Sequence, residues 1–404
     1  MRVAIAVEGT RGDIHPMLRL ADSLVGRGHD VVFCAPPDFA EQVSSRGLAF
    51  RPVGRDIRAY LESEARAVHG GALAMARTAD RLFRENVGAQ FRDLLAGIER
   101  AELVIAAGTQ LAASSLAEHL GAAYRFVAFD PILLPSSHHP PFAFPWTELP
   151  RRLNRLAWTL LDALTRLRIG PTIDRERARL DLPPARDPYA LCLGPRPILA
   201  AEEILAPAPP DVKEVQTIGC LHPFEPTPLP EKVEQFLAAG EPPIYVGFGS
   251  MTDPDPARTT RLVLEAARRA GVRVLLSEGW AGLAQAPLPE SALAIGSLSH
   301  AALFQRVAAV VHHGGAGTTT TAARAGVPQI LIPHVLDQFH WAHRMQRLGL
   351  SPPPIPRRRL DVDRLCATLR AVQDNEVLTQ RAREIADRLF AALRERPEPA
   401  DALV

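Results

Sequence analysis

The stretch from Val310 to Arg344 contains residue types that could bind a phosphate group and a sugar. An apolar run, 308–311, is followed by His-His-Gly-Gly-Ala-Gly-Thr, and a run of small residues that predicts a helix comes directly afterwards despite its threonines. Glycine lets the backbone approach an anion closely, and a helix N-terminus offers unpaired N–H groups with about half a positive charge. The order of strand, glycine turn and helix therefore predicts an anion-binding site. An ordinary helix start is the weaker interpretation, because four successive threonines disfavour a helix.

A polar pair follows the next apolar run. The run 329–332 ends at Pro333, and Asp337 and Gln338 come shortly afterwards. A carboxylate beside a carboxamide can form directional hydrogen bonds with neighbouring hydroxyl groups of a sugar. The alternative for the aspartate is to cap the helix that follows. We interpret the pair as a sugar-binding site.

The turn after the first apolar run contains a candidate general base. Residues 3–7 lead into Gly-Thr-Arg-Gly-Asp-Ile-His, in which the aspartate is Asp13 and the histidine is His15. A carboxylate at this place can take a proton from an attacking hydroxyl, or it can simply cap the next helix. His15 is a second candidate for the base. The turn lacks the GxGxxG spacing, so binding of NAD is not expected.

The order of these residues resembles the donor-binding signature of GT-B glycosyltransferases of the UDP-glycosyltransferase type, in the branch of bacterial antibiotic and sterol glucosyltransferases. The His-x-Gly-x-x-Thr core appears as His313, Gly315 and Thr318, and the closing Asp-Gln as Asp337 and Gln338. The resemblance implies two Rossmann-like, doubly wound parallel-sheet domains that face each other across a cleft. It also implies an inverting transfer of a hexose from a nucleotide sugar to a hydroxyl of a small acceptor.

The same resemblance gives each candidate residue a role. It makes Asp13 the catalytic base, and it turns His312 away from the ligand into the sheet. Ser299 replaces a proline that is usual in the family, which leaves the choice between a UDP-linked and a dTDP-linked donor open. The implied contacts are Asp337 and Gln338 for the sugar, Leu298 and Ser299 for the nucleobase, and His313, Gly315, Ala316, Gly317, Thr318 and Ser250 for the diphosphate.

No metal or other cofactor is expected besides the nucleotide-sugar cosubstrate. In the resembling family, the helix N-terminus and His313 stabilise the leaving diphosphate. Two Asp-x-Asp patterns of the kind found in metal-dependent glycosyltransferases occur at 253–255 and 361–363. The first lies in a proline-rich turn and the second at a helix start, so we interpret both as structural.

The acceptor site is the least specified part of the sequence. Three segments, 60–90, 130–146 and 151–168, are candidate walls. The resemblance implies a small hydrophobic natural product or a sterol-like molecule as acceptor, whereas the arginines and histidines of these segments also allow a polar one. Basic residues in 151–155 could bring the helix 151–168 to a membrane surface, although a solvated helix face is the favoured interpretation. The aromatic candidates for the pocket are Phe83, Phe129, Phe142, Phe144 and Trp146.

Length, charge and cysteine usage limit the class of protein. The 404 residues predict two domains, and a formal net charge of +1 offers no electrostatic reason to bind nucleic acid. The four cysteines show no metal-binding spacing, as expected for free thiols in a reducing cytoplasm. We expect a cytoplasmic protein without stable membrane insertion, although peripheral membrane contact is not ruled out. Its expected partners are a nucleotide-sugar donor and a small-molecule acceptor. The expected oligomeric state is a monomer or a homodimer.

Apolar runs that alternate with helical periodicity predict the elements that position these residues. The predicted strands are 3–7, 31–35, 48–53, 103–107, 124–129, 215–218, 244–248, 272–276, 293–295, 308–311 and 329–332. They divide the chain into an acceptor-binding domain at 1–215, a nucleotide-sugar-binding domain at 216–378 and a helix at 379–404 that crosses back.

Two other functions fit parts of this pattern. A nucleotide-sugar epimerase or hydrolase would use the same architecture without an acceptor, and a non-catalytic partner protein would only bind the nucleotide sugar. A pure binding protein needs neither Asp13 nor the pair Asp337 and Gln338, so the sequence favours a transferase.

Overall fold

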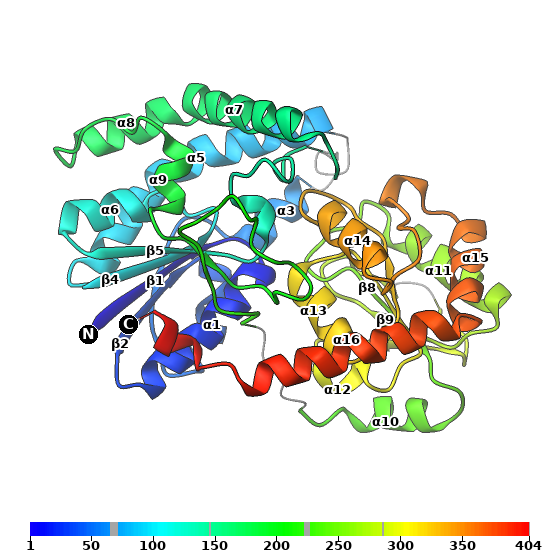
Figure 1. Ribbon diagram of the computed structural model, residues 1–404. Coiled ribbons are helices and arrows are strands. Elements are labelled where there is room, and N and C mark those ends of the chain that lie inside the picture. Colours follow the sequence, from blue (N-terminus) through cyan, green and yellow to red (C-terminus); the bar gives the residue numbers. More distant parts are fainter. Residues whose placement is uncertain (65–71, 145–146, 222–226, 285–286, 404) are drawn as a thin grey trace.

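A computed structural model describes residues 1–64, 72–144, 147–221, 227–284 and 287–403 (Figure 1). In this described part, two parallel sheets form two α/β domains, with helices packed on their faces. The predicted fold class is therefore confirmed. The predicted apolar runs form strands because a parallel strand covered on both faces is apolar at every position.

The first sheet has seven strands in the order β3-β2-β1-β4-β5-β6-β7. Residues 3–7 of the central strand are fully buried. β6 was not predicted, because it lies in a proline-punctuated part of the chain. The bounds are β1 Arg2–Glu8, β2 Asp30–Ala35, β3 Ala49–Pro52, β4 Leu103–Gly108, β5 Ala123–Ala128, β6 Ile198–Leu199 and β7 Gln216–Thr217.

The second sheet has five strands in the order β10-β9-β8-β11-β12. In each sheet, the chain adds strands first on one side of the first strand and then on the other. This change of direction lies between β1 and β4 in the first sheet and between β8 and β11 in the second. The turns after these strands lie where ligands of doubly wound sheets bind. The bounds are β8 Ile244–Gly247, β9 Val274–Ser277, β10 Ala292–Ile295, β11 Ala309–His312 and β12 Gln329–Leu331.

Helices cover both sheets and form most of the connections between successive parallel strands. In the first domain these are α1 Arg11–Gly26, α2 Ala40–Ser44, α3 Ile57–Ser63, α5 Ala72–Ile98, α6 Ala113–Leu120, α7 Arg151–Arg168, α8 Gly170–Ala178 and α9 Pro188–Leu193. In the second they are α10 Glu231–Ala238, α11 Pro256–Ala270, α12 His300–Phe304, α13 Ala316–Arg324, α14 Gln338–Arg347, α15 Val362–Gln373 and α16 Glu376–Arg394.

The ends of the first sheet and of the last helix lie near the predicted domain boundaries. β7 pairs with β6, so the first sheet extends to Thr217, past the predicted boundary at residue 215. The last helix spans Glu376–Arg394, as its amphipathic periodicity predicts, and packs against α13 of the second domain. Only the segment after α16 crosses back to the first domain (Figure 1). There Ala400 and Leu403 join the hydrophobic cluster that β1 and α1 form.

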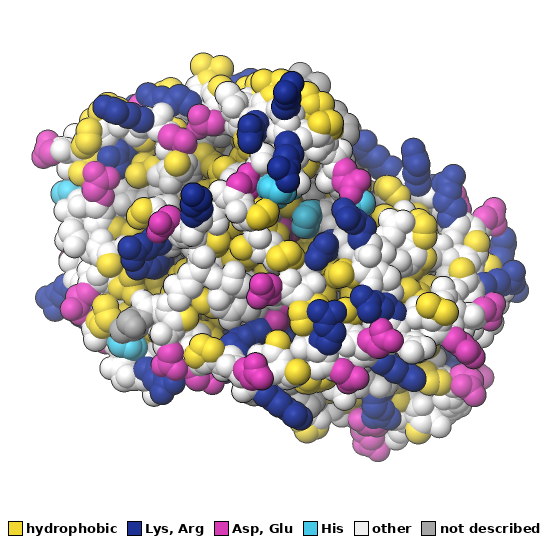
Figure 2. Space-filling view, in the orientation of Figure 1, with side chains coloured by type: hydrophobic (Ala, Val, Ile, Leu, Met, Phe, Trp, Pro, Cys, Tyr) yellow, Lys and Arg dark blue, Asp and Glu magenta, His cyan; other side chains and the backbone are white. Residues whose placement is uncertain are grey.

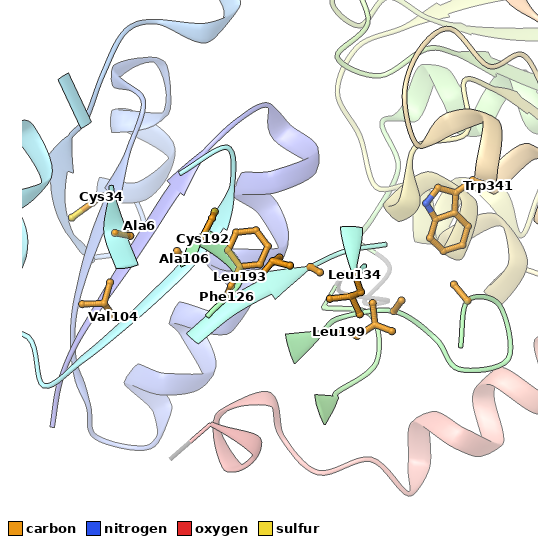
Figure 3. Close-up of a cluster of buried hydrophobic side chains, with 14 of the residues drawn as sticks. Ala6, Cys34, Val104, Ala106, Phe126, Leu134, Cys192, Leu193, Leu199 and Trp341 are labelled. Carbon is orange, nitrogen blue, oxygen red and sulfur yellow. The ribbon is translucent and has the colours of Figure 1, made fainter. Parts of the chain in front are cut away.

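The domains share a hydrophobic cluster and a buried ion network. The cluster includes Phe126 and Leu199 from the first sheet and Trp341 from α14 (Figure 3). Beside it, Glu202 of the first domain pairs with Arg324 at 2.5 Å and with Arg396. Glu202 and Arg324 are each only 2% exposed, so this network lies inside the interdomain contact. No helix in the described part is apolar and long enough to cross a membrane.

Candidate active site

Asp13 occupies the third position of α1, at the carboxyl end of β1. The backbone N–H of Thr10 donates a hydrogen bond to Asp13 Oδ2 at 2.8 Å, so the carboxylate does cap the helix. The capping uses one oxygen and leaves Oδ1 on the side of Gly108. A Cβ atom would lie 2.1 Å from Oδ2 if added at Gly9 and 3.3 Å from Oδ1 if added at Gly108. Both glycines therefore make room for the carboxylate.

The two candidate bases differ in their surroundings. Burial raises the pKa of Asp13 to about 6, although hydrogen bonds at the start of α1 partly offset this. The ring of His15 contacts the side-chain amide of Gln42 at 2.9 Å, and burial lowers the pKa of His15 to about 4. Near neutral pH, the carboxylate is thus mostly ionised and the imidazole is neutral. Capping and a role as base are compatible for Asp13.

Asp337 approaches Asp13 from the other domain. Burial and the negative charge of Asp13 together raise the pKa of Asp337 to about 7. Asp337 is the N-cap residue of α14, and its side chain makes no capping hydrogen bond to the following turn, although the backbone N–H groups of Asp337 and Gln338 lower its pKa. Leu336 immediately before it has a φ of 50°, a left-handed conformation that costs a leucine about 1–3 kcal/mol. Such strain beside a polar side chain is typical of a binding site.

A third carboxyl group, which sequence reasoning missed, belongs to the same place. Asp130 follows β5 directly, and burial together with the charge of Asp337 raises its pKa well above the usual value. Its Oδ1 accepts a hydrogen bond from the N–H of Ile132 and lies 3.9 Å from Nε2 of His340. Within the described residues, Oδ2 is buried without a hydrogen-bond partner. The available signal was an aspartate at the carboxyl end of a predicted strand, as for Asp13.

Gln338 lies beside Asp337 but is turned inward. Its side-chain oxygen accepts hydrogen bonds from the N–H groups of His334 and Val335, at 2.8 and 3.2 Å. Its amide nitrogen lies 3.2 Å from the sulfur of Met251. The residue is buried, and these contacts shape the loop between β12 and α14. In this conformation, the carboxamide supports the loop that presents Asp337.

His312 and its partners hold the glycine turn after β11. The N–H of Gly314 donates to Nδ1 of His312 at 3.1 Å, so the proton of the neutral ring lies on Nε2. That nitrogen donates to Oε1 of Gln329 at 2.9 Å, and the amide of Gln329 donates to the carbonyl of Thr319. His312 is fully buried, which confirms that it points into the sheet. Gly314 adopts a φ of 94°, which favours glycine.

His313 faces the opposite way, toward the N-terminus of α13. Its half-buried ring lies between two glycine turns, because a Cβ atom at Gly249 or Gly315 would come within 2.9 Å or 2.5 Å of it. Burial, together with the charges of His334 and His300, lowers the pKa of His313 to about 3. Its Nδ1 has no hydrogen-bond partner among the described residues. The ring is therefore neutral, and a neutral imidazole can hydrogen-bond a ligand through a ring nitrogen that faces it.

The first turn of α13 presents unpaired amides beside His313. Gly315 is the N-cap, no side chain caps the helix, and the N–H of Thr319 makes the first helical bond, to the carbonyl of Gly315. The amides of residues 316–318 therefore have no helical partner. The hydroxyls of Thr319 and Thr321 donate to carbonyls of their own helix, whereas Thr318 is half-exposed at the open end. Ser250 is also half-exposed, in the turn after Gly249.

Leu298 and Ser299, the two residues that the resemblance assigns to the nucleobase, lie directly before α12. The Ser299 hydroxyl accepts a hydrogen bond from the N–H of Ala302 at 3.3 Å and caps this helix. Leu298 packs partly against the core of the second domain. Sequence reasoning missed a contact nearby across the domains: the guanidinium of Arg11 lies 5.6 Å from the ring centre of Trp280. This contact joins the start of α1 to the loop after β9.

A small apolar cavity lies between the loop after β5 and the start of α14. Two of the predicted pocket residues, Phe142 and Phe144, line it, together with Leu336, Phe339 and His340. It is therefore adjacent to Asp337 and to the His340–Asp130 contact. Sequence reasoning left Phe339 out of the site.

The other predicted acceptor residues lie elsewhere. Phe129 packs against the core of the first domain and does not line the cavity. Phe83 belongs to α5, but its side chain is outside the described part of the structure, as is all of Trp146.

Both Asp-x-Asp patterns have structural partners. Asp253 pairs with Arg357 at 2.7 Å, and Asp255 caps α11. Asp361 caps α15, as predicted. No group of three or more His, Cys, Asp or Glu residues that could hold a metal ion occurs in the ranges that the structure describes.

The fold and this site define a GT-B glycosyltransferase, and comparisons with known proteins agree. Residues 3–129 match the glycosyltransferase family 28 N-terminal domain, and residues 265–403 match the C-terminal domain of erythromycin biosynthesis protein CIII-like proteins. Glycosyltransferase GtfE of Amycolatopsis orientalis is 36% identical, over 98% of this chain and 98% of its own. The vancomycin aglycone glucosyltransferase of the same organism is 37% identical, over 88% of this chain and 87% of its own.

Solved structures share the fold. The crystal structure of glycosyltransferase VinC in complex with dTDP has a TM-score of 0.71 at 21% identity, covering 100% of this chain and 98% of that one. The chain belongs to the GT-B glycosyltransferases of the UDP-glycosyltransferase type, in the branch of bacterial antibiotic glycosyltransferases.

Proposed function

We propose that this enzyme is an inverting, metal-independent glycosyltransferase that moves a hexose from a UDP- or dTDP-linked donor to a hydroxyl of a small hydrophobic natural product or sterol-like acceptor. The proposal rests on two strand ends: β1 leads to the carboxylate of Asp13 between Gly9 and Gly108, and β11 leads to His313 and the uncapped start of α13. The names of two similar proteins, a vancomycin aglycone glucosyltransferase and a complex with dTDP, support the acceptor and donor classes.

The reaction follows from the positions of these groups. Asp13 takes the proton of the acceptor hydroxyl while its oxygen attacks the anomeric carbon, and the bond from that carbon to the diphosphate breaks. The departing diphosphate keeps the electron pair and moves toward His313 and the open amides of α13. Attack from the face opposite the leaving group inverts the anomeric centre, so an α-linked donor yields a β-glycoside. Asp337 binds hydroxyls of the hexose, and Gln338 supports its loop.

A transfer assay with EDTA tests this proposal. UDP-glucose and dTDP-glucose are offered with a panel of polyketide, glycopeptide and sterol acceptors, and the product linkage is determined by NMR. We expect a β-glycoside and no loss of activity with EDTA. An α-glycoside would contradict inversion, and loss of activity that Mg²⁺ restores would contradict metal independence. Donor consumption without any glycoside would instead favour a hydrolase or epimerase.

We expect the imidazole of His313 to form a hydrogen bond with the donor diphosphate. His313→Ala should raise the Kd for UDP or dTDP roughly 10–150-fold, because a hydrogen bond to a charged group contributes about 1.5–3 kcal/mol. Isothermal titration calorimetry measures the change. His119→Ala, which removes an exposed histidine from α6, is the matched control. Equal affinity for both variants would exclude the contact.

The activity of the free enzyme is expected to rise with pH around pH 6. Asp13 cannot accept a proton while it is protonated, and its pKa is raised to about 6 by burial. Below that pH, kcat/KM should therefore fall about tenfold per pH unit, and above it should level off as the carboxylate ionises. A profile that stays flat from about pH 5 to about pH 8 would contradict this ionisation.

A further inference from the structure

Helix α7 carries a row of leucines that faces solvent. Their spacing of three and four residues places them on one side of the helix. They make up five of the nine large hydrophobic side chains that are exposed in the described ranges, and they are 43% to 69% exposed. Amphipathic helices of globular proteins normally bury such a row. We call this row the leucine face: Leu153, Leu156, Leu160, Leu164 and Leu167.

The other side of α7 fixes this orientation. Asn154 donates a hydrogen bond to the carbonyl of Ser137 at 2.9 Å, and Trp158 donates one to the carbonyl of His139 at 3.1 Å. Asn154, Ala157 and Trp158 are buried against the first domain. Rotating the helix to cover the leucines would break these buried contacts. The leucine face is thus held outward by the packing of the domain.

Positive charge accompanies the leucine face. Five arginines and one aspartate lie in α7, and Arg151, Arg152 and Arg155 are exposed in its first turns. Cations at a helix N-terminus oppose the helix dipole, so these arginines do not stabilise the helix. Together with the dipole, they create a positive potential at this end. Figure 2 shows dark blue and yellow side chains side by side along the top of the molecule, where α7 lies in Figure 1.

We propose that α7 docks on an anionic lipid bilayer, parallel to the membrane plane, with the leucine face in the boundary between headgroups and acyl chains. An exposed apolar row beside basic residues is the pattern of interfacial helices, and anionic headgroups complement the arginines. A second copy of this chain fits less well, because pairing two such faces would bring the arginines of both copies together. The enzyme would therefore lie on the membrane through α7 and not cross it.

The docking would orient the acceptor side of the enzyme. The loop that α7 fastens through Ser137 and His139 continues to Phe142 and Phe144, which line the apolar cavity. Docking of α7 would place this loop beside the lipid, so a hydrophobic acceptor could enter from the bilayer. This consequence rests on the proposed function, whereas the docking itself does not.

Vesicle co-sedimentation tests the docking without an activity assay. The full-length protein is mixed with vesicles of phosphatidylcholine alone or with added phosphatidylglycerol. We expect binding to the anionic vesicles that weakens with salt. The triple variant Leu156→Ser, Leu160→Ser and Leu167→Ser should bind at least about tenfold more weakly. Val377→Ser, at an exposed valine of α16, is the control and should bind as the wild type does.

A second variant separates charge from apolar contact. Arg151→Gln, Arg152→Gln and Arg155→Gln together should weaken binding to anionic vesicles and reduce its dependence on salt. Circular dichroism checks that each variant is folded. Absence of wild-type binding to anionic vesicles, or equal binding by the leucine variant, would overturn the proposal. A wild-type dimer in sedimentation velocity that the leucine substitutions dissociate would also overturn it and identify a second copy as the occupant.

Discussion

Replacing Asp13 by asparagine is expected to lower kcat for glycosyl transfer by about 10²–10⁴, the usual contribution of a general base. The amide cannot accept the hydroxyl proton, but its oxygen can still accept the hydrogen bond from the N–H of Thr10 that caps α1. The folded structure and donor binding should therefore persist. Initial rates at saturating donor, with thermal melting in the presence of UDP or dTDP, separate the two effects.

The neighbouring Asp22 supplies the control for this experiment. It lies in the same helix and pairs with Arg46 at the surface, so Asp22→Asn should leave kcat near the wild-type value. Unchanged turnover in Asp13→Asn would show that another residue acts as the general base. Asp130 would be tested next, because its carboxyl group lies in the same cluster.

Replacing Glu202 by alanine is expected to cause the largest loss of stability. The change leaves Arg324 buried without its carboxylate partner, and removing one member of a buried ion pair costs about 3–5 kcal/mol. Arg396, which holds the segment after α16 to the first domain, would lose the same partner. We expect a lower midpoint of urea unfolding and easier proteolysis after residue 394.

Glu148→Ala is the matched control for Glu202. Glu148 also joins the two domains, through Arg347 and His343, but its side chain is 62% exposed. Exposed pairs contribute up to about 1 kcal/mol, so this variant should be close to the wild type in stability. Similar losses in both variants would show that burial of the Glu202 network is not what stabilises the interdomain contact.

Lowering the pH should weaken the ion network of Glu202, Arg324 and Arg396. Burial alone would raise the pKa of Glu202, but the hydrogen bonds and charges of Arg396 and Arg324 outweigh it and lower the pKa below its ordinary 4.5. The folded protein thus binds this proton less readily than the unfolded chain does. The contribution of Glu202 to stability is present above the ordinary pKa and is lost as the pH falls through the lowered one.

The local features of the site could be predicted from the sequence. The strand, glycine turn and helix around His313 follow from residue order, because apolar runs, glycines and small residues act over a few positions. The orientation of His312 toward the sheet follows from the family resemblance, and His312 is fully buried. The bounds of α7 also match the predicted helix 151–168, because its periodicity is continuous.

Side-chain direction could not be predicted in the same way. Gln338 has the residue type that suits a sugar contact, yet it bonds to the loop of His334 and Val335. Asp130 gave no motif, and Phe339 looked like a wall residue, although both lie at the junction of the domains. In α7, the pattern shows a leucine face but does not tell whether it is covered.

The sequence by itself therefore determined the two parallel-sheet domains, the glycine turn between β11 and α13 and the position of Asp13 at the start of α1, since hydrophobic period and capping chemistry are local properties of the chain. Only the tertiary structure decided that Asp13, Asp130 and Asp337 come together, that Glu202 links the domains and that the leucine face is exposed. These residues lie on separate elements, and their distances depend on how whole sheets and helices pack.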